Sequence, residues 1–475
     1  MYTIRAGSPP IPLQAVNWTD GTQPTGSQLA HVTKSSTAAL LALLAATAMF
    51  RLTQNMAITT FSLLGRERLG IGPGTLGVLA ALSGLVMVGS TLTIAARIPV
   101  ARSVRMAAVG AALLAGALLV FAVAPSLAVF TAAIVILGIA GGLGMPGLTN
   151  AAGSVSAEAR ERALALYTLT LSASLAVGPL VETFVLDAAG QDIRAPFVSF
   201  LVFPILAATV LIFRCRISPV DTRRRSPSRA GDPAVQLGHE SSPAQALGGQ
   251  PPQVGAISPR ATRSRHWSAL RRWPASKEGA SEGIFSTHGG RLAITGLLLY
   301  AVPFAGITVF GALIARIAFG VSAADAQLAF TAFFVTSFAA RAAIAWRAPI
   351  THKVAMFWLA AGLSVTGLLL LAVGHGLGLL LVAMAVLGIP HGLTFPMALS
   401  LVAESTAPRA LPRANAVMLA TTNMSTVLMP AILGSLVAFA GYRGMVLFIL
   451  IPVLGFSSLL WVQRRPQADH AVPSS

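Results

Sequence analysis

Charged residues are scarce in this sequence. Asp, Glu, Lys and Arg together make up 10% of its 475 residues, whereas a soluble globular protein contains about 25%. Hydrophobic residues make up 55%. This composition excludes an ordinary soluble domain, because the surface of such a domain needs more charge than the chain contains. It predicts a protein that lies mostly in a lipid bilayer.

Cysteine and the common catalytic motifs are also nearly or wholly missing. Cys215 is the single cysteine, so an intrachain disulfide and a metal site with two cysteine ligands are excluded. The sequence has no GxxxxGKS/T phosphate-binding run, no HExxH pattern and no GxSxG pattern. These absences argue against a pump driven directly by ATP and against a hydrolase. We expect a protein that is not an enzyme, with no cofactor, no metal and no catalytic residues.

Long apolar runs dominate what is present. Twelve runs are long enough for a helix to cross ~30 Å of hydrocarbon while satisfying its own backbone hydrogen bonds. They span about 37–63, 75–96, 106–124, 127–149, 163–186, 196–213, 292–315, 324–346, 354–373, 377–400, 414–439 and 443–462. The predicted fold class is an all-α membrane protein with twelve transmembrane helices.

The second half of the chain repeats the first at a constant spacing of 250 residues. The matches include Arg, Pro and Met residues in the turns between apolar runs, where chance matches of Leu or Ala cannot explain them. Arg97, Pro99, Val104 and Met106 recur as Arg347, Pro349, Val354 and Met356, and Arg66 and Gly70 recur as Arg316 and Gly320. The sequence therefore predicts two six-helix pseudo-repeats, at 36–214 and 291–463.

The distribution of Lys and Arg predicts the orientation. With the N-terminal tail (1–35) in the cytoplasm, the outer loops hold only five arginines, and nearly all other basic residues lie inside. This asymmetry predicts an integral protein of the cytoplasmic (inner) membrane with both termini cytoplasmic, including the tail 464–475. The tail 1–35 lacks the pattern of a cleaved signal peptide. The net charge of +18 is then explained by topology and by membrane lipids, and no nucleic-acid partner is expected.

The two halves are joined by a stretch rich in Arg, Ser, Pro, Gly and Gln. Its composition predicts a disordered basic cytoplasmic linker over 215–290. Basic and aromatic residues alternate between Arg263 and Trp273, which is also compatible with a helix that lies on the inner membrane surface. The sequence leaves both interpretations open.

The paired segments carry a resemblance to a known family. The turns RIPVARSVRM and RAPITHKVAM, the segments LGIAGGLGMP and LGIPHGLTFP, and the long basic central loop resemble those of the major facilitator superfamily (MFS). The resemblance implies an MFS-like fold that works by alternating access, with helices one, four, seven and ten around a central cavity. Three features depart from the family. The turn with Arg97, Arg102 and Arg105 lacks an Asp, the fourth predicted helix lacks an Arg before its Gly-rich stretch, and Gly178-Pro179 is followed by Glu182 and Thr183 instead of a glycine pair.

Small residues and prolines in the predicted helices are candidates for gating. Glycines four residues apart give a flat strip on which another helix can lie closely, and prolines create bends. The candidates for gating or packing are Gly138, Gly142, Pro146, Gly178, Pro179, Gly388, Gly392 and Pro396. Simple helix packing, without any gating role, is the alternative for each.

Polar residues inside the apolar runs are candidates for solute binding, because a charge in the bilayer costs a few kcal/mol on insertion scales. Arg51, Gln54 and Asn55 lie in the first predicted helix, and Tyr300 and His391 lie in the seventh and tenth. Arg51 would bind an anionic group of the solute or a carboxylate across the bundle. The alternative is that it contacts backbone carbonyls or extends outward, as we expect for Arg341 near the end of its helix.

Two residues are candidates for proton coupling. Glu182 is the one carboxylate clearly within a predicted span, and His391 has a side chain that titrates near neutral pH. A structural glutamate near the end of the fifth helix and a packing histidine are the alternatives.

These features predict a secondary transporter, and three hypotheses remain. The first is a permease that exports amphipathic small organic solutes by alternating access, with protons as the coupling ion. The second is uptake or exchange of an organic anion centred on Arg51. The third is a transport-inactive membrane receptor or scaffold. Loss of anion transport in an Arg51→Gln variant would favour the second.

Overall fold

The computed structural model describes residues 26–154, 160–217, 284–347, 350, 352–407 and 410–463. Every regular element in these ranges is a helix. Most of the predicted linker 215–290, with its segment from Arg263 to Trp273, lies outside the described residues. The same holds for most of the predicted tail 1–35 and for all of 464–475. The assignments of these segments therefore stay predictions.

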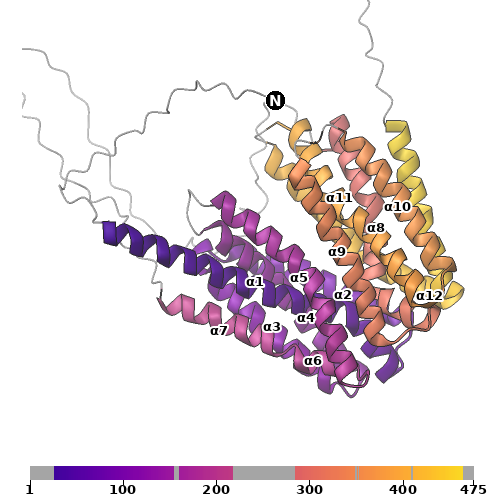
Figure 1. Cartoon of the computed structure of the whole chain (residues 1–475), viewed down its shortest axis with the longest axis horizontal. Coiled ribbons are helices and arrows are strands. Elements are labelled where there is room, and N and C mark those ends of the chain that lie inside the picture. The colour runs from indigo at the N-terminus through magenta and orange to yellow at the C-terminus, as the bar shows by residue number, and fades with distance from the viewer. Residues whose placement is uncertain are drawn as a thin grey trace, which may run out of the picture.

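The first half forms one helical bundle (Figure 1). Its long helices are joined by short turns, and α6 is a brief helix that leads into α7. The elements are α1 (Gly26–Leu69), α2 (Pro73–Thr93), two 3-10 turns (Ala95–Arg97 and Val100–Arg102), α3 (Ser103–Val123), α4 (Leu127–Gly153), α5 (Arg160–Ala188), α6 (Ala195–Ser199) and α7 (Val202–Ile217). Helix α1 begins at Gly26, ahead of the first predicted apolar run, so its first turns are polar.

The second half forms the other bundle, from α8 (His288–Ala318), α9 (Ala323–Arg347), α10 (Lys353–Val373), α11 (Gly376–Ser405) and α12 (Leu411–Gln463). Eleven stretches of the described residues are long and apolar enough to span a membrane. The last of these has 51 residues, more than twice the length one crossing needs. Its helix breaks at Gly441, where φ is 65° and ψ is −179°. The break divides α12 into two spans, and the predicted fold of twelve transmembrane helices is confirmed.

The 250-residue repeat is visible in the backbone. Helices α2 and α9 begin at positions 73 and 323, and α3 and α10 run over 103–123 and 353–373. The turn before α2 is closed by a hydrogen bond from Ile71 N to Gly65 O (3.0 Å), and the turn before α9 by Val321 N to Ala315 O (3.4 Å). The two bundles therefore share one chain path, as two pseudo-repeats should.

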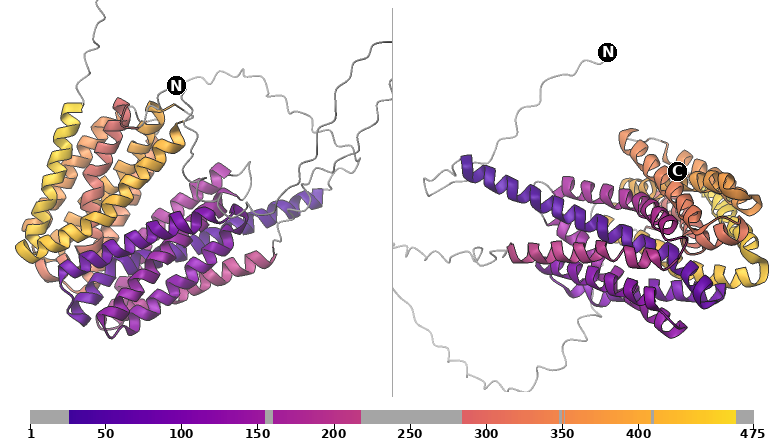
Figure 2. Two further views of the ribbon diagram at one scale, coloured as in Figure 1. Left: turned by 180° about the vertical axis from the view of Figure 1, so that it is seen from behind. Right: turned by 60° about the horizontal axis from the view of Figure 1, so that its bottom comes forward.

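The two bundles lie together at one end and spread apart toward the other (Figures 1 and 2). We call the end where α1 ends and α9 begins the closed end. The linker end is the opposite one, where α7 ends at Ile217 and α8 begins at His288. Contacts between the bundles involve α2 with α12, α5 with α9, and α1 with α8.

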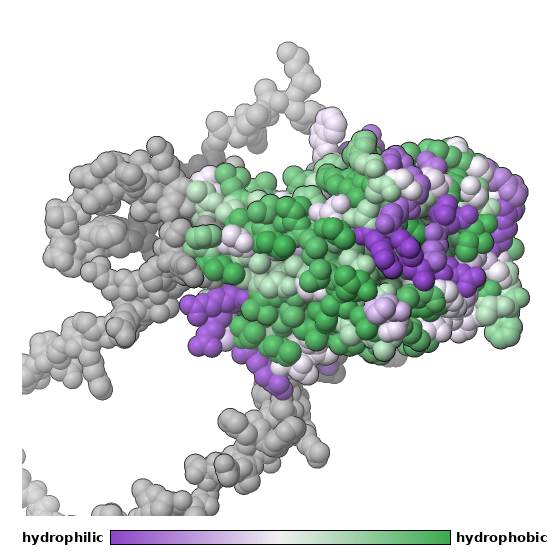
Figure 3. Space-filling model, turned by 90° about the horizontal axis from the view of Figure 1, so that it is seen from below, coloured by the Kyte–Doolittle hydropathy of each residue, from purple (hydrophilic) through white to green (hydrophobic). Residues whose placement is uncertain are grey.

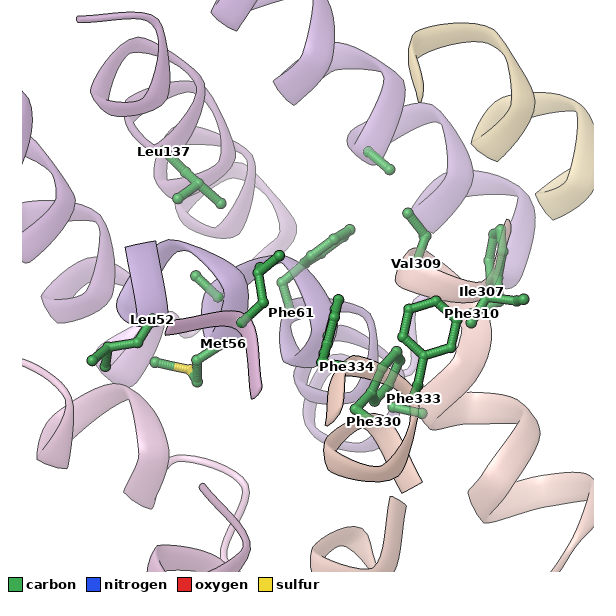
Figure 4. Close-up of a cluster of buried hydrophobic side chains, with 14 of the residues drawn as sticks. Leu52, Met56, Phe61, Leu137, Ile307, Val309, Phe310, Phe330, Phe333 and Phe334 are labelled. Carbon is green, nitrogen blue, oxygen red and sulfur yellow. The ribbon is translucent and has the colours of Figure 1, made fainter. Parts of the chain in front are cut away.

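Apolar side chains cover both the outside and the interior. Figure 3 shows a broad hydrophobic surface, with hydrophilic residues gathered at the right and in a smaller patch at the lower left. Phe439 and Trp346 are about nine-tenths exposed, at 89% and 91%, which suits contact with lipid. In the interior, Phe330, Phe333 and Phe334 of α9 pack beside Phe310 of α8 (Figure 4). The apolar surface and helix lengths agree with an integral membrane protein.

Candidate functional site

Arg51 lies in the middle of α1 and begins a polar stripe on that helix. Its Nη1 donates a hydrogen bond of 2.9 Å to Gln54 Oε1. Gln54 is buried against α4, where Gly141 leaves the space: a Cβ there would lie 2.5 Å from Gln54 Nε2. Asn55 is also buried, and its Nδ2 has no hydrogen-bond partner among the described residues. Arg51 thus contacts a side chain of its own helix and does not extend outward.

Arg341 lies on α9 and reaches across to the other bundle. Its Nη1 donates to Ser172 Oγ on α5 (2.9 Å), and its Nη2 donates to His391 O on α11 (3.4 Å). This corrects the expectation that Arg341 extends outward to the membrane surface. The reason is that Ser172 Oγ and the backbone oxygen of His391 offer acceptors inside the protein.

Arg51 and Arg341 belong to opposite bundles, and neither has a carboxylate partner among the described residues. The two guanidinium groups interact electrostatically, and both also act on His391. The ion pairs found within the described ranges lie elsewhere: Arg68–Asp192, Arg316–Glu67 and Lys353–Glu404. The hydroxyl of Tyr167 interacts electrostatically with Arg51 and shares a 2.8 Å hydrogen bond with Thr149. The region between the bundles is therefore positively charged.

His391 lies in an aromatic cluster between α8, α9 and α11. Its ring stacks on Phe304, with centroids 4.4 Å apart and planes 17° apart, and the centroid of Tyr300 is 5.5 Å away. Its Nδ1 shares a 2.8 Å hydrogen bond with Ser337 Oγ. The buried hydroxyl of Tyr300 has no partner among the described residues. A buried polar group without a partner costs about 1–3 kcal/mol, so this hydroxyl marks a place where a solute group could bind.

Glu182 belongs to a second polar cluster, at the closed end. Its side chain is completely buried, and its Oε1 accepts a hydrogen bond from Thr60 of α1. Thr60 Oγ1 in turn accepts from Gln327 Nε2 of α9 at 3.1 Å. The three residues link α5, α1 and α9 and therefore cross between the bundles. In the described part of the chain, Glu182 Oε2 and Gln327 Oε1 have no hydrogen-bond partner.

The predicted site residues thus fall into two groups. Arg51 and Gln54 are bonded to each other, Asn55 lies next to them, and Tyr300 and His391 share one aromatic cluster. Glu182 and His391 have different partners and lie in different clusters, and their roles in proton coupling stay predictions. Sequence reasoning missed Gln327, Thr60 and Ser172. Gln327 carried a usable signal, because it is a buried amide within an apolar span, but its partners are distant in the chain.

The predicted gating glycines pack within bundles. A Cβ at Gly138 would lie 2.7 Å from Ser83 O, and one at Gly142 would lie 2.6 Å from Met87 O, both on α2. In the second repeat, Gly388 and Gly392 of α11 lie against Phe333 and Ser337 of α9. These two residues are the equivalents of Ser83 and Met87, 250 positions later in the chain. The packing of these glycines is therefore the same in the two repeats. A gating role for them stays a prediction.

Of the predicted prolines, Pro179 lies one turn before a contact between the bundles. Pro146, Pro179 and Pro396 are inside α4, α5 and α11. Gly178 faces α1, where a Cβ would lie 3.1 Å from Leu52 O. One turn later, Thr183 Oγ1 donates to Pro179 O (2.9 Å) and to Ala324 O (3.3 Å). The bend of α5 thus lies next to its contact with α9.

Two further interactions join the bundles at the closed end. Arg316 Nε donates to Glu67 Oε1 at 2.9 Å. Gln191 Oε1 accepts from the backbone of Ala324, in the first turn of α9, at 3.0 Å. Gln191 has a φ of 68° and follows Gly190, whose φ is 62°. This strained turn places the amide of one bundle at a helix N-terminus of the other, where unpaired N–H groups need acceptors.

Comparison with known proteins finds the same fold in solved structures of transporters. The chain shares its fold with the nucleoside transporter NupG (TM-score 0.60, 14% identity, 90% of this chain and 98% of that chain). A bacterial homologue of the human lysosomal transporter Spinster, inward-facing and unoccupied, matches with a TM-score of 0.61 and 12% identity over 90% and 96% of the two chains. A POT family transporter in complex with a thioalcohol-conjugated peptide matches with a TM-score of 0.64 and 12% identity, over 90% and 96%.

These identities show a common fold and do not extend to the solute. No curated protein sequence matches the chain. The family model of the Major Facilitator Superfamily matches residues 43–317 and 293–475, which together include both bundles. The agreement of this match with the twelve-helix fold and its repeat shows a non-enzymatic membrane transporter, and the chain belongs to the Major Facilitator Superfamily.

Proposed function

We propose that this protein is a secondary carrier of a small organic anion, which binds between Arg51 of one bundle and Arg341 of the other. The observation that carries the proposal is the arginine pair itself. The two guanidinium groups belong to different bundles, interact electrostatically, and lack an acidic partner within the described residues. Of the three hypotheses from the sequence, this supports transport of an organic anion.

An anion would remove the cost of this arrangement. A charge inside a membrane protein is expensive unless it is paired, and two like charges add repulsion. Guanidinium groups bind carboxylates and phosphates with two parallel hydrogen bonds. A solute with such a group would neutralise Arg51 and Arg341 together. The hydroxyl of Tyr300 and Nδ2 of Asn55, which lack partners in the described part of the chain, are donors for its other polar groups.

Binding between bundles also explains why the solute would be transported. Ser172 and Arg341 already join α5 to α9, so a ligand at Arg341 competes for the same side chain that connects the halves. A ligand that interacts differently with two arrangements of the bundles shifts their populations. Because the chain has no nucleotide-binding motif, an ion gradient would drive the cycle, and protons are the proposed coupling ion.

The test is uptake by the full-length protein in proteoliposomes. A panel of small mono- and dicarboxylates and organophosphates is supplied with and without a pH gradient. Arg51→Gln and Arg341→Gln should each lower uptake of the transported anion at least about tenfold, as expected for a lost buried charge contact. Arg347→Gln is the matched control, because Arg347 is on the same helix as Arg341 but exposed, and it should keep wild-type uptake.

Two results would contradict the proposal. One is unchanged anion uptake in both arginine variants. The other is a panel in which only neutral or cationic compounds are transported.

Export of amphipathic compounds, the first hypothesis from the sequence, is the second candidate. The observation that favours it is the aromatic cluster around His391, where Phe304 is only partly buried. Aromatic walls suit apolar solutes that are recognised loosely. A dye-extrusion assay separates the two functions, because Arg51→Gln would leave extrusion of a neutral dye largely intact while it abolishes anion uptake.

A further inference from the structure

We infer that Glu182, Thr60 and Gln327 form a proton-operated latch that holds the two bundles together at the closed end. The inference deepens the proposed carrier function in one respect: it assigns the residues through which protons would control movement of the bundles. The solute site at Arg51 and Arg341 is not part of it.

The geometry places the latch between bundles. Glu182 and Thr60 belong to α5 and α1 of the first bundle, and Gln327 belongs to α9 of the second. Glu182 and Gln327 are each completely buried, as is Thr60. The hydrogen bond from Gln327 Nε2 to Thr60 Oγ1, at 3.1 Å, therefore lies in a buried contact between bundles. It must break when α9 moves away from α1.

Counting donors and acceptors shows that the cluster lacks one proton. Thr60 uses its hydroxyl hydrogen for Glu182 Oε1, and Gln327 uses an amide hydrogen for Thr60. Two buried acceptors, Glu182 Oε2 and Gln327 Oε1, are left without a donor among the described residues. If the carboxyl is ionised, both acceptors stay unsatisfied and a negative charge is buried. A proton on the carboxyl removes the charge and turns one of its oxygens into a donor.

No cation replaces that proton. The helices that pack against α5 are α1, α9, α4 and α6. Their charged groups at this end are engaged elsewhere: Glu67 with Arg316, Arg68 with Asp192, and Asp325 with Ser322. Arg66 of α1 is exposed and acts on Tyr442 of α12. Arg51 and Arg341 lie deeper along α1 and α9, and neither acts on Glu182, whose one resolved interaction is with Thr60. Helices α4 and α6 carry no charged residue, and Asp187 of α5 is exposed and accepts from Gln191.

Proton binding and closure are therefore linked. With the proton bound, the contact of α5, α1 and α9 is neutral and hydrogen-bonded, and the closed end is stable. Without it, a buried and unpaired carboxylate opposes the contact, because burial of a lone charge costs several kcal/mol. Separation of α9 from α1 would let water reach the carboxylate. The proton would thus be exchanged with the solution on the side of the closed end, and only when that end opens.

The test measures opening directly and needs no solute. In full-length protein with Cys215→Ser, spin labels are placed at Ala189→Cys and Ile317→Cys, which are exposed positions at the closed end of the two bundles. Distances between the labels are measured in lipid at pH 5 and pH 9. The population with the longer distance should rise about tenfold at pH 9 in the protein with native Glu182.

Three variants make the result decisive. Glu182→Gln, which is neutral at every pH, should change less than about twofold between the two pH values. Asp187→Asn, an exposed carboxyl on the same helix whose Oδ1 can still accept from Gln191, should keep the native response. Gln327→Leu, which keeps the volume but removes the link, should show at pH 5 the longer distances that the native residue shows at pH 9.

The inference is overturned if Glu182→Gln responds to pH like the native protein, if the native protein shows no pH response, or if Gln327→Leu stays closed at pH 5. Should Glu182→Gln not fold, Thr60→Val and Gln327→Leu decide the matter, since neither alters the carboxyl. A lost pH response with intact anion uptake would count against the latch alone, and lost anion uptake with an intact response would count against the proposed solute alone.

Discussion

Arg341 of α9 donates a 2.9 Å hydrogen bond to Ser172 of α5, and this bond connects the two bundles next to the proposed solute site. The guanidinium group therefore has a hydrogen-bond partner that a bound anion would replace.

Ser172→Ala should tighten anion binding. A hydrogen bond to a charged group contributes about 1.5–3 kcal/mol, and part of this is lost when the solute takes over the guanidinium group. Removing the competing hydroxyl should lower the dissociation constant of the transported anion by up to about tenfold, which corresponds to ~1.4 kcal/mol. Titration calorimetry in detergent measures the constant. Weaker binding in Ser172→Ala would mean that Ser172 holds Arg341 in its binding position.

Tyr300→Phe should raise the stability of the protein and weaken its binding of the anion. The hydroxyl of Tyr300 is buried without a partner among the described residues, so its removal should stabilise the empty protein by about 1–3 kcal/mol. If the hydroxyl contacts the solute, the same change should weaken anion binding several-fold. Thermal unfolding and calorimetry on the same sample test both parts. A variant that is neither more stable nor weaker in binding would show that water already satisfies the hydroxyl.

The sequence was sufficient to predict the fold because the repeat and the apolar runs are local signals. The spacing of 250 residues recurs in the helix bounds and in the contacts of Gly138 and Gly388. The division of α12 at Gly441 was also predictable, since a span has a fixed length set by the bilayer.

The site was predictable only in part. Arg51, Gln54 and His391 could be selected because polar residues in apolar runs are conspicuous. The direction of the Arg341 side chain could not be predicted, because the position of a residue along a helix gives its depth in the membrane but not the neighbour that its side chain contacts. The link of Glu182 to Gln327 joins residues far apart in the chain, and it depends on how the two bundles meet.

Gly388→Ala should destabilise the protein through its contact with α9. A Cβ at this position would meet the backbone oxygen of Phe333 and the hydroxyl of Thr336, and overpacking of this kind costs about 1–3 kcal/mol. Gly138→Ala, the equivalent change in the first repeat, should behave alike because its Cβ would lie 2.7 Å from Ser83 O. Thermal unfolding in detergent measures the loss.

Gly362→Ala is the matched control for both changes. Beyond its own helix backbone and chain neighbours, no described atom lies within 4 Å of its added Cβ. Ala also has a higher helix propensity than Gly by up to about 1 kcal/mol. This variant should therefore be as stable as the native protein or slightly more so. Equal melting temperatures for all three variants would show that α2 and α9 yield easily to a methyl group.

Asp192 should contribute to stability only above its own titration range. The hydrogen bond from Arg68 lowers the pKa of this carboxyl below its ordinary value of 3.8, and the backbone N–H of Arg194 adds to the effect. A carboxyl with a lowered pKa in the folded protein stabilises it fully above the ordinary value, and loses that contribution as pH falls through the folded-state pKa. Because both side chains are more than two-fifths exposed, the contribution should stay below about 1 kcal/mol. Asp192→Asn should therefore melt at a slightly lower temperature than the native protein at pH 6. This difference in melting temperature should vanish as the pH falls below 3.8. A difference that persists in acid would show that the loop depends on the shape of the side chain and not on its charge.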